Sequence, residues 1–151
     1  MNHSSESVFP GQPLLPGHAT GTTLVLTQPL NAWGGLDPHT GQIVHHSHPQ
    51  KGADISGTVL VLEETRGSGT NAQIFAQTWA EGHGPAGIIL LRPDFVLSVG
   101  AVVSTELYAT TCPILVVSEA IYETIQTGMQ AEITATMESA TVRIASPSHL
   151  T

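Results

Sequence analysis

Apolar residues in this chain recur with two different periods, which predict strands and helices in alternation. Three runs are apolar almost throughout, as in strands covered on both faces: 58–62, 87–91 and 113–117. Helical spacing or capping signals predict three helices: 71–81, 95–103 after Asp94, and 118–128. β-Branched residues predict a first strand over 19–28, and alternating apolar and polar residues predict a closing hairpin over 130–136 and 140–145.

This order of elements predicts a mixed α/β fold, a sandwich or partly open barrel with two or three short helices. Residues 1–16 are rich in Ser, Pro, Gln and Gly, so we expect a mobile N-terminal arm. One domain should follow over 17–145, and 146–151 should be a frayed tail. The segment 29–54 is longer than a plain connection, which indicates a functional loop or an interface.

Charge excludes several classes of partner. Lys and Arg total 4 against 12 Asp and Glu, for a net charge of −8, so we expect no nucleic-acid or anionic-membrane partner. The chain has no apolar stretch of about 20 residues and no basic, apolar leader at its start, and we expect a cytoplasmic protein. The single Cys112 cannot hold an iron–sulfur cluster alone and is interpreted as a buried structural residue.

The segment Arg66-Gly67-Ser68-Gly69-Thr70 lies between a predicted strand and a predicted helix. Flanking glycines let the backbone approach a ligand, and the helix start directs amides and positive dipole charge to the same place. With Arg66 and the amides of Gly67 and Gly69, this setting would stabilise Ser68 as an alkoxide able to take a proton beside a carboxylate. Alternatively, Ser68, Thr70 and Asn71 only compete to cap the helix, and the local pattern favours neither interpretation.

Three other patterns allow weaker hypotheses. Gly67, Gly69 and Ala72, with Asp94 further on, match a dinucleotide-binding fingerprint, but four residues separate its glycines from the strand. The histidines at 45, 46 and 48 could bind a transition metal, although a solvated loop is the commoner outcome and we assign no metal ligands. Trp33-Gly34-Gly35 before Asp37-Pro38 favours a tight turn with Trp33 on the core over a binding site.

Taken together, these blocks resemble the small subunit, or swivel domain, of aconitase X proteins. The resemblance covers roughly residues 17–136, and its blocks occur in the family's order: 33–41, 52–57, 66–68, 85–89, 94, 99–101 and the strand from 113. The Trp-Gly-Gly-x-Asp-Pro-x-Thr-Gly and Arg-Gly-Ser blocks carry most of it. One departure is that Gly69, Thr70 and Asn71 follow Ser68, where the family often continues with further serines.

The resemblance implies a swivelling β/β/α domain that works with a large, cluster-bearing subunit in a heteromeric dehydratase. Ser68 would then be the catalytic base, with Arg66, Gly67, Gly69 and Thr70 as substrate contacts and the iron–sulfur centre on the large subunit. The family includes dehydratases of cis-3-hydroxy-L-proline and of phosphomevalonate, and the scarcity of Lys and Arg mildly favours cis-3-hydroxy-L-proline over the phosphorylated alternative. A nucleotide-binding module using 67–72, and a swivel that contributes no chemistry, are the alternatives of other classes.

Overall fold

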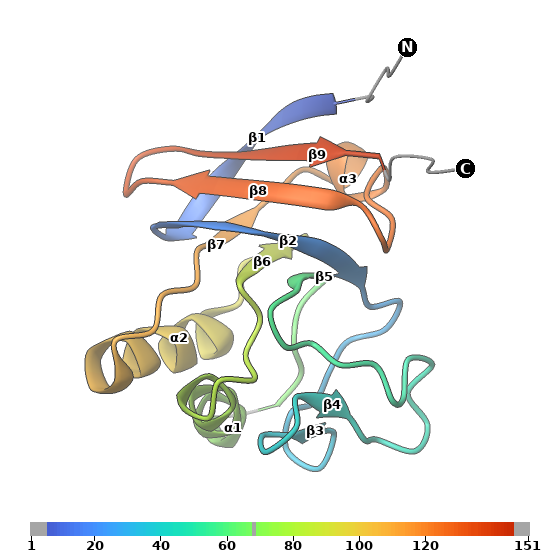
Figure 1. The fold of residues 1–151 in the computed structure, drawn as a ribbon, viewed down its shortest axis with the longest axis vertical. Helices are drawn as coiled ribbons and strands as arrows, with labels where there is room; N and C mark the ends of the chain where they lie inside the picture. Colours follow the sequence, from blue (N-terminus) through green and yellow to red (C-terminus); the bar gives the residue numbers. More distant parts are fainter. Residues whose placement is uncertain (1–5, 68, 147–151) are drawn as a thin grey trace.

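The structure is a computed structural model that describes residues 6–67 and 69–146 (Figure 1). Its barrel strands are β1 (Glu6–Leu15), β2 (Gly17–Val25), β5 (Val59–Leu62), β6 (Gly87–Leu90), β7 (Ile114–Val116), β8 (Gln130–Ala135) and β9 (Ala140–Ala145). The other elements are the short strands β3 (Leu36–Asp37) and β4 (Gln42–Ile43) and the helices α1 (Gly69–Ala80), α2 (Phe95–Tyr108) and α3 (Glu119–Tyr122). The mixed α/β class is therefore confirmed.

Seven strands close into a barrel in the order β1-β7-β6-β5-β2-β8-β9, and β9 pairs with β1 to complete the ring. The barrel is closed, where the sequence predicts a sandwich or a partly open barrel. Strands β2, β5, β6 and β7 run parallel to one another, whereas β8 and β9 form an antiparallel hairpin, and the pairs β2–β8, β9–β1 and β1–β7 are also antiparallel. Helices α1 and α2 lie side by side against the parallel half, as Figure 1 shows below the barrel.

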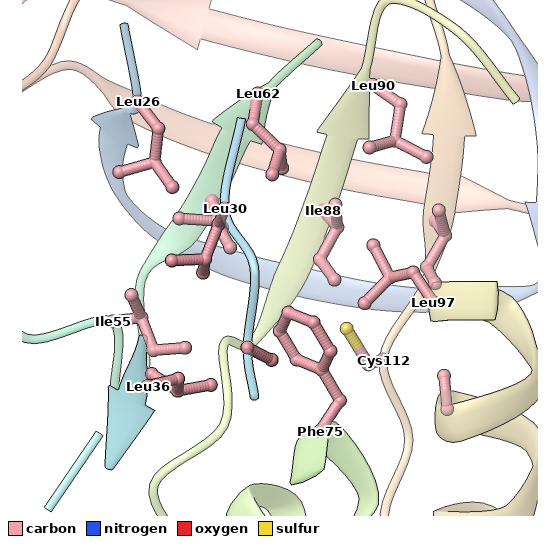
Figure 2. Packing of buried hydrophobic residues seen from close by; sticks show 14 of the residues in the cluster. Leu26, Leu30, Leu36, Ile55, Leu62, Phe75, Ile88, Leu90, Leu97 and Cys112 are labelled. Carbon is pink, nitrogen blue, oxygen red and sulfur yellow. The ribbon is translucent and has the colours of Figure 1, made fainter. Parts of the chain in front are cut away.

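The parallel strands are buried on both faces, which explains their continuous apolar runs. Along β5, Val59 and Val61 belong to the cluster inside the barrel, whereas Leu60 and Leu62 face the helices. Figure 2 shows the helix-side cluster, in which Phe75 of α1 and Leu97 of α2 reach toward strand β6.

The segment expected to be a mobile arm is instead a barrel strand over residues 6–15. Strand β1 pairs with β9 from Glu6 to Gly11 and then with β7 from Gln12 to Leu15. Its side chains are exposed or half-buried, so little apolar signal marks it, and its place depends on backbone pairing across the chain. The expectation for residues 1–16 is therefore wrong for 6–15, while residues 1–5 lie outside the described part.

Helix boundaries also differ from the sequence prediction. Asp94 caps α2 as expected, but the helix continues to Tyr108 and ends where Ala109 adopts a left-handed conformation. Ser118 caps α3 as expected, but this helix is a single turn rather than a helix reaching Gly128. Within the predicted loop 29–54, β3 and β4 form a small hairpin.

The carboxyl ends of the parallel strands bring three loops together. The loop after β5 pairs with the loop after β2, because the amide of Arg66 donates to the carbonyl of Leu30 at 3.0 Å. It also meets the loop after β6, where Thr65 binds Asp94. Ligands of open parallel sheets are bound at such an edge, so this edge is the place to look for a site. Among the described residues, no helix is both long and apolar enough to cross a membrane.

Candidate functional site

The loop between β5 and α1 is held from the α2 side by Asp94. The backbone amide and the hydroxyl of Thr65 both donate to Oδ2 of Asp94, at 2.6 and 2.5 Å. The other oxygen, Oδ1, accepts the amide of Leu97 at 3.0 Å and so caps α2. Asp94 is buried, and it therefore fixes the position of the Arg66–Gly67 segment relative to α2.

From the opposite side, the loop is held by Asn71, whose side chain is only 1% exposed. Its Oδ1 accepts the amide of Trp33 at 2.8 Å, and its Nδ2 donates to the carbonyl of Arg66 at 2.6 Å. One side chain thus joins the loop after β2 to the loop after β5. Gly67 lies against it with φ of +121°, and a Cβ there would overlap the Asn71 amide.

A small cavity opens beside this clamp. Its volume is about 140 Å³, and it is lined by Asn31, Trp33, Gly67, Thr70 and Asn71. The backbone of Trp33 is held by Asn71 while its indole is 65% exposed. An exposed indole next to a glycine loop offers a large apolar surface to whatever enters or covers the cavity.

The structure brings together part of the predicted site. Gly67 and Thr70 line the cavity, while Arg66 and Gly69 are exposed on the same loop and are not among its lining residues. Ser68 lies outside the described residues. Helix α1 begins at Gly69, so its first amides, which have no partner within the helix, are at this end of the loop. In the described part of the chain, the guanidinium of Arg66 takes part in no ion pair, unlike Arg92 and Arg143.

The predicted packing of Trp33 on the core is wrong. The turn itself is present, because the amides of Gly35 and Leu36 both donate to the carbonyl of Ala32. It turns the indole outward to the cavity, however, so the binding-site interpretation of this block gains support. Asp37 serves the β3–β4 hairpin, where its Oδ1 accepts the amide of His39 at 2.9 Å.

Two histidines of the 45–48 loop bind backbone groups through their ring nitrogens. Nδ1 of His45 accepts the amide of Ser47, and Nδ1 of His48 accepts the amide of Gln50. The rings of His45 and His46 stack with centroids 5.1 Å apart. Within residues 6–67 and 69–146, no group of three or more His, Cys, Asp or Glu side chains is arranged to hold a metal ion.

Two further sequence interpretations can be judged from burial and hydrogen bonds. Cys112 is buried, and that burial raises the pKa of its thiol far above the ordinary value, outweighing a contact with Trp79, so the structural interpretation is confirmed. Asp94 is buried and both of its oxygens accept hydrogen bonds inside the protein, which disfavours a ribose contact at this position of the fingerprint.

Sequence reasoning missed Asn31 as a lining residue and Asn71 as the clamp. From the sequence, Asn71 is predicted only as a candidate helix cap, since a polar residue at the start of a helix often has that role. The available signal is its position: a polar residue four places after Gly67 that lies on the same helix face as the apolar Ile74 and Phe75. Asn31 carries no such signal, because only the folding of the loop after β2 brings it to the cavity.

Comparison with known proteins identifies the family. A sequence profile of the aconitase X swivel domain matches residues 8–144. This chain belongs to that family. The swivel domain is 34% identical over 106 residues to the cis-3-hydroxy-L-proline dehydratase of Pseudomonas aeruginosa, covering 70% of this chain and 18% of that protein. The corresponding enzyme of Hypocrea jecorina is 29% identical over 117 residues, covering 78% of this chain and 20% of that protein.

The swivel domain thus spans about a fifth of the length of these two relatives. It is also 32% identical over 94 residues to the phosphomevalonate dehydratase small subunit of Methanocella arvoryzae, covering 62% of this chain and 71% of that subunit. Among solved structures, aconitase X of Thermococcus kodakaraensis in its holo-form has a TM-score of 0.77 and 23% identity, covering 90% of this chain and 98% of that one. This last likeness shows that the fold is shared.

Proposed function

We propose that this chain is the small subunit of an aconitase X-type hydro-lyase that eliminates water from cis-3-hydroxy-L-proline. Membership of the swivel domain family and the hydroxyproline dehydratases among the relatives support the reaction class. The observation that carries the proposal is the clamped loop at the carboxyl edge of the parallel strands. It presents Arg66, Gly67 and Thr70 beside a cavity, and a guanidinium, backbone amides and a hydroxyl are groups that bind an anionic substrate.

In this proposal Ser68 is the base. Its alkoxide takes the proton from the carbon next to the carboxylate, and the electron pair of that C–H bond forms a C=C bond while the C–O bond on the neighbouring carbon breaks. The leaving hydroxide becomes water when the Ser68 hydroxyl returns the abstracted proton to it, which regenerates the alkoxide. A serine needs a lowered pKa to do this. The α1 amides that begin at Gly69, the dipole of this helix and the Arg66 guanidinium are the groups on this chain that would stabilise the alkoxide.

The roles of the flanking residues follow from the clamp. Gly67 lets the backbone approach the substrate closely, and Thr70 offers a hydroxyl to it from the first turn of α1. Asp94 and Asn71 hold Thr65 and Arg66 from two sides, so the segment before the proposed base is fixed in advance of the reaction. We class Asp94 and Asn71 as positioning residues, because the hydrogen bonds of both side chains are made to other groups of this chain.

We assign the iron–sulfur centre to a separate large subunit. The residues of this chain do not fit a cluster: its single thiol is buried with a raised pKa, whereas such clusters are held by several thiolates. Positive charge for the substrate must also come from elsewhere, because a chain with 4 basic residues and a net charge of −8 attracts an anion only weakly. The large subunit would therefore complete both the cavity and its positive potential. We place this heteromer in the cytoplasm.

The test is to co-express this chain with the aconitase X-type large chain encoded in the same genome and to assay dehydration of both candidate substrates. Ser68→Ala should lower kcat by about 100-fold or more with a smaller effect on KM, because it removes only the proton acceptor. Ser139→Ala, in the β8–β9 turn away from the loop, is the matched control and should leave kcat unchanged. Near-wild-type turnover by the Ser68 variant removes this residue from the mechanism.

Phosphomevalonate is the second candidate substrate, because this domain is a separate small subunit in the phosphomevalonate dehydratases it resembles. The same assay decides between the two acids. A nucleotide-binding module is a third candidate that the engaged oxygens of Asp94 disfavour, and calorimetry of the isolated chain with nicotinamide and adenine nucleotides should detect no binding.

A further inference from the structure

An exposed apolar stripe runs along α2. Phe95, Val99, Val103 and Leu107 follow one another at four-residue spacing, which places them in one stripe. Phe95, Val99 and Leu107 are 72%, 54% and 66% exposed, and Glu106 is the only charged residue in the helix. Single exposed apolar residues are ordinary, but a continuous stripe marks a surface that another molecule covers.

The fold of this domain does not itself require that stripe. Helix α2 packs on α1 through its opposite face, where Gly100 lies directly against the backbone of Ala72. Helix α1 provides an internal comparison, since Gln73 and Gln77 occupy exposed positions in it. Two neighbouring helices on the same face of the barrel therefore differ in what they present outward, which points to a specific role for α2.

A hollow of about 300 Å³ continues the apolar stripe. It lies between α2 and the β1–β2 connection, and it is lined by Leu15, Pro16, Val102 and Cys112 with Thr105, Glu106 and Thr111. Val102 is itself 43% exposed and links the hollow to the stripe. A partner that lies along α2 could insert an apolar side chain here, as the anchors of stable protein interfaces do.

We infer that the α2 stripe and this hollow are the docking surface for the large subunit. This inference rests on the proposed function. In the hydroxyproline dehydratases, the aligned region is 18% and 20% of the chain, so about four fifths of each relative is available to cover this domain. The position of α2 also favours the large subunit as the partner that covers the stripe. Helix α2 begins at Asp94, which holds Thr65 in the candidate catalytic loop, so a subunit that closes over this loop also meets Phe95.

The test measures binding of the purified chain to the aconitase X-type large chain of the same genome, without substrate. Val99→Asp and Leu107→Asp should each weaken the dissociation constant at least tenfold, because a carboxylate would be buried in an apolar interface. Met137→Asp, at an 80% exposed position in the β8–β9 turn, is the matched control and should bind within twofold of wild type. Thermal unfolding by circular dichroism checks that each variant is folded.

Three outcomes would overturn the inference: both α2 variants bind within twofold of wild type, the large chain does not bind the wild-type chain, or Val99→Asp only dissociates a dimer of this chain. Failure here is distinguishable from failure of the proposed function. If the α2 variants bind normally and the complex is active, the docking surface is wrong and the dehydratase stands. If binding behaves as expected but the wild-type complex dehydrates neither acid, the docking surface stands and the proposed function fails.

Discussion

The steric fit between Gly67 and Asn71 allows a quantitative test of how the candidate loop is held. Gly67 has φ of +121°, and a Cβ at this position would overlap the side-chain amide of Asn71. Gly67→Ala therefore has two costs. Backbone strain in this region costs about 1–3 kcal/mol. Displacing Asn71 loses its hydrogen bonds to Trp33 and Arg66, at about 1 kcal/mol each.

These values predict a non-additive double-mutant cycle. Gly67→Ala alone should lower the free energy of unfolding by about 3–5 kcal/mol, and Asn71→Ala alone by about 2 kcal/mol. In the Asn71→Ala background the overlap is gone, so Gly67→Ala should cost only the backbone strain of about 1–3 kcal/mol. The expected coupling is therefore about 2 kcal/mol.

The assay is urea denaturation of the four proteins, followed by circular dichroism. Asn71→Asp is a useful further variant, because it keeps the acceptor for the Trp33 amide and removes the donor to the Arg66 carbonyl. Additivity of the two alanine substitutions to within about 0.5 kcal/mol would refute the proposed clamp, since residues that share no contact behave that way.

Two further predictions concern α2 packing and one ion pair. Gly100→Val should lower the free energy of unfolding by about 3 kcal/mol, because a Cβ at this position would lie 2.8 Å from the carbonyl oxygen of Ala72. Gly69→Ala is the control and should not be destabilising, because nothing lies within 4 Å of a Cβ there. Thermal unfolding compares the two, and equal melting temperatures of the Gly100 and Gly69 variants would contradict this account. The hydrogen bond and charge of Glu81 raise the pKa of His39, and His39 lowers the pKa of Glu81. The stabilisation from this pair should be complete between the ordinary values of 4.5 and 6.5, be lost as pH rises through the raised pKa of His39, and be lost as pH falls through the lowered pKa of Glu81. In an NMR titration, Glu81→Gln should lower the pKa of His39, and an unchanged pKa would rule out the pairing.

Much of this fold could be predicted from the order of residues. The strands β5, β6 and β7 were predicted because both of their faces are buried, which leaves only apolar residues in each run. The caps Asp94 and Ser118 and the β8–β9 hairpin were predicted because their signals are local: a side chain that accepts from an amide three residues on, and alternation in neighbouring strands.

The tertiary structure alone decided the closure of the barrel and the composition of the site. Strand β1 is held by backbone hydrogen bonds to β9 and β7, which demand no particular side chains and therefore leave no pattern to read. Asn71 and Trp33 are 38 positions apart, and their hydrogen bond exists only because the loops after two parallel strands meet at one edge. Local periodicity and capping depend on residues that are close in the sequence, whereas contacts between distant loops depend on how the strands are ordered in the sheet.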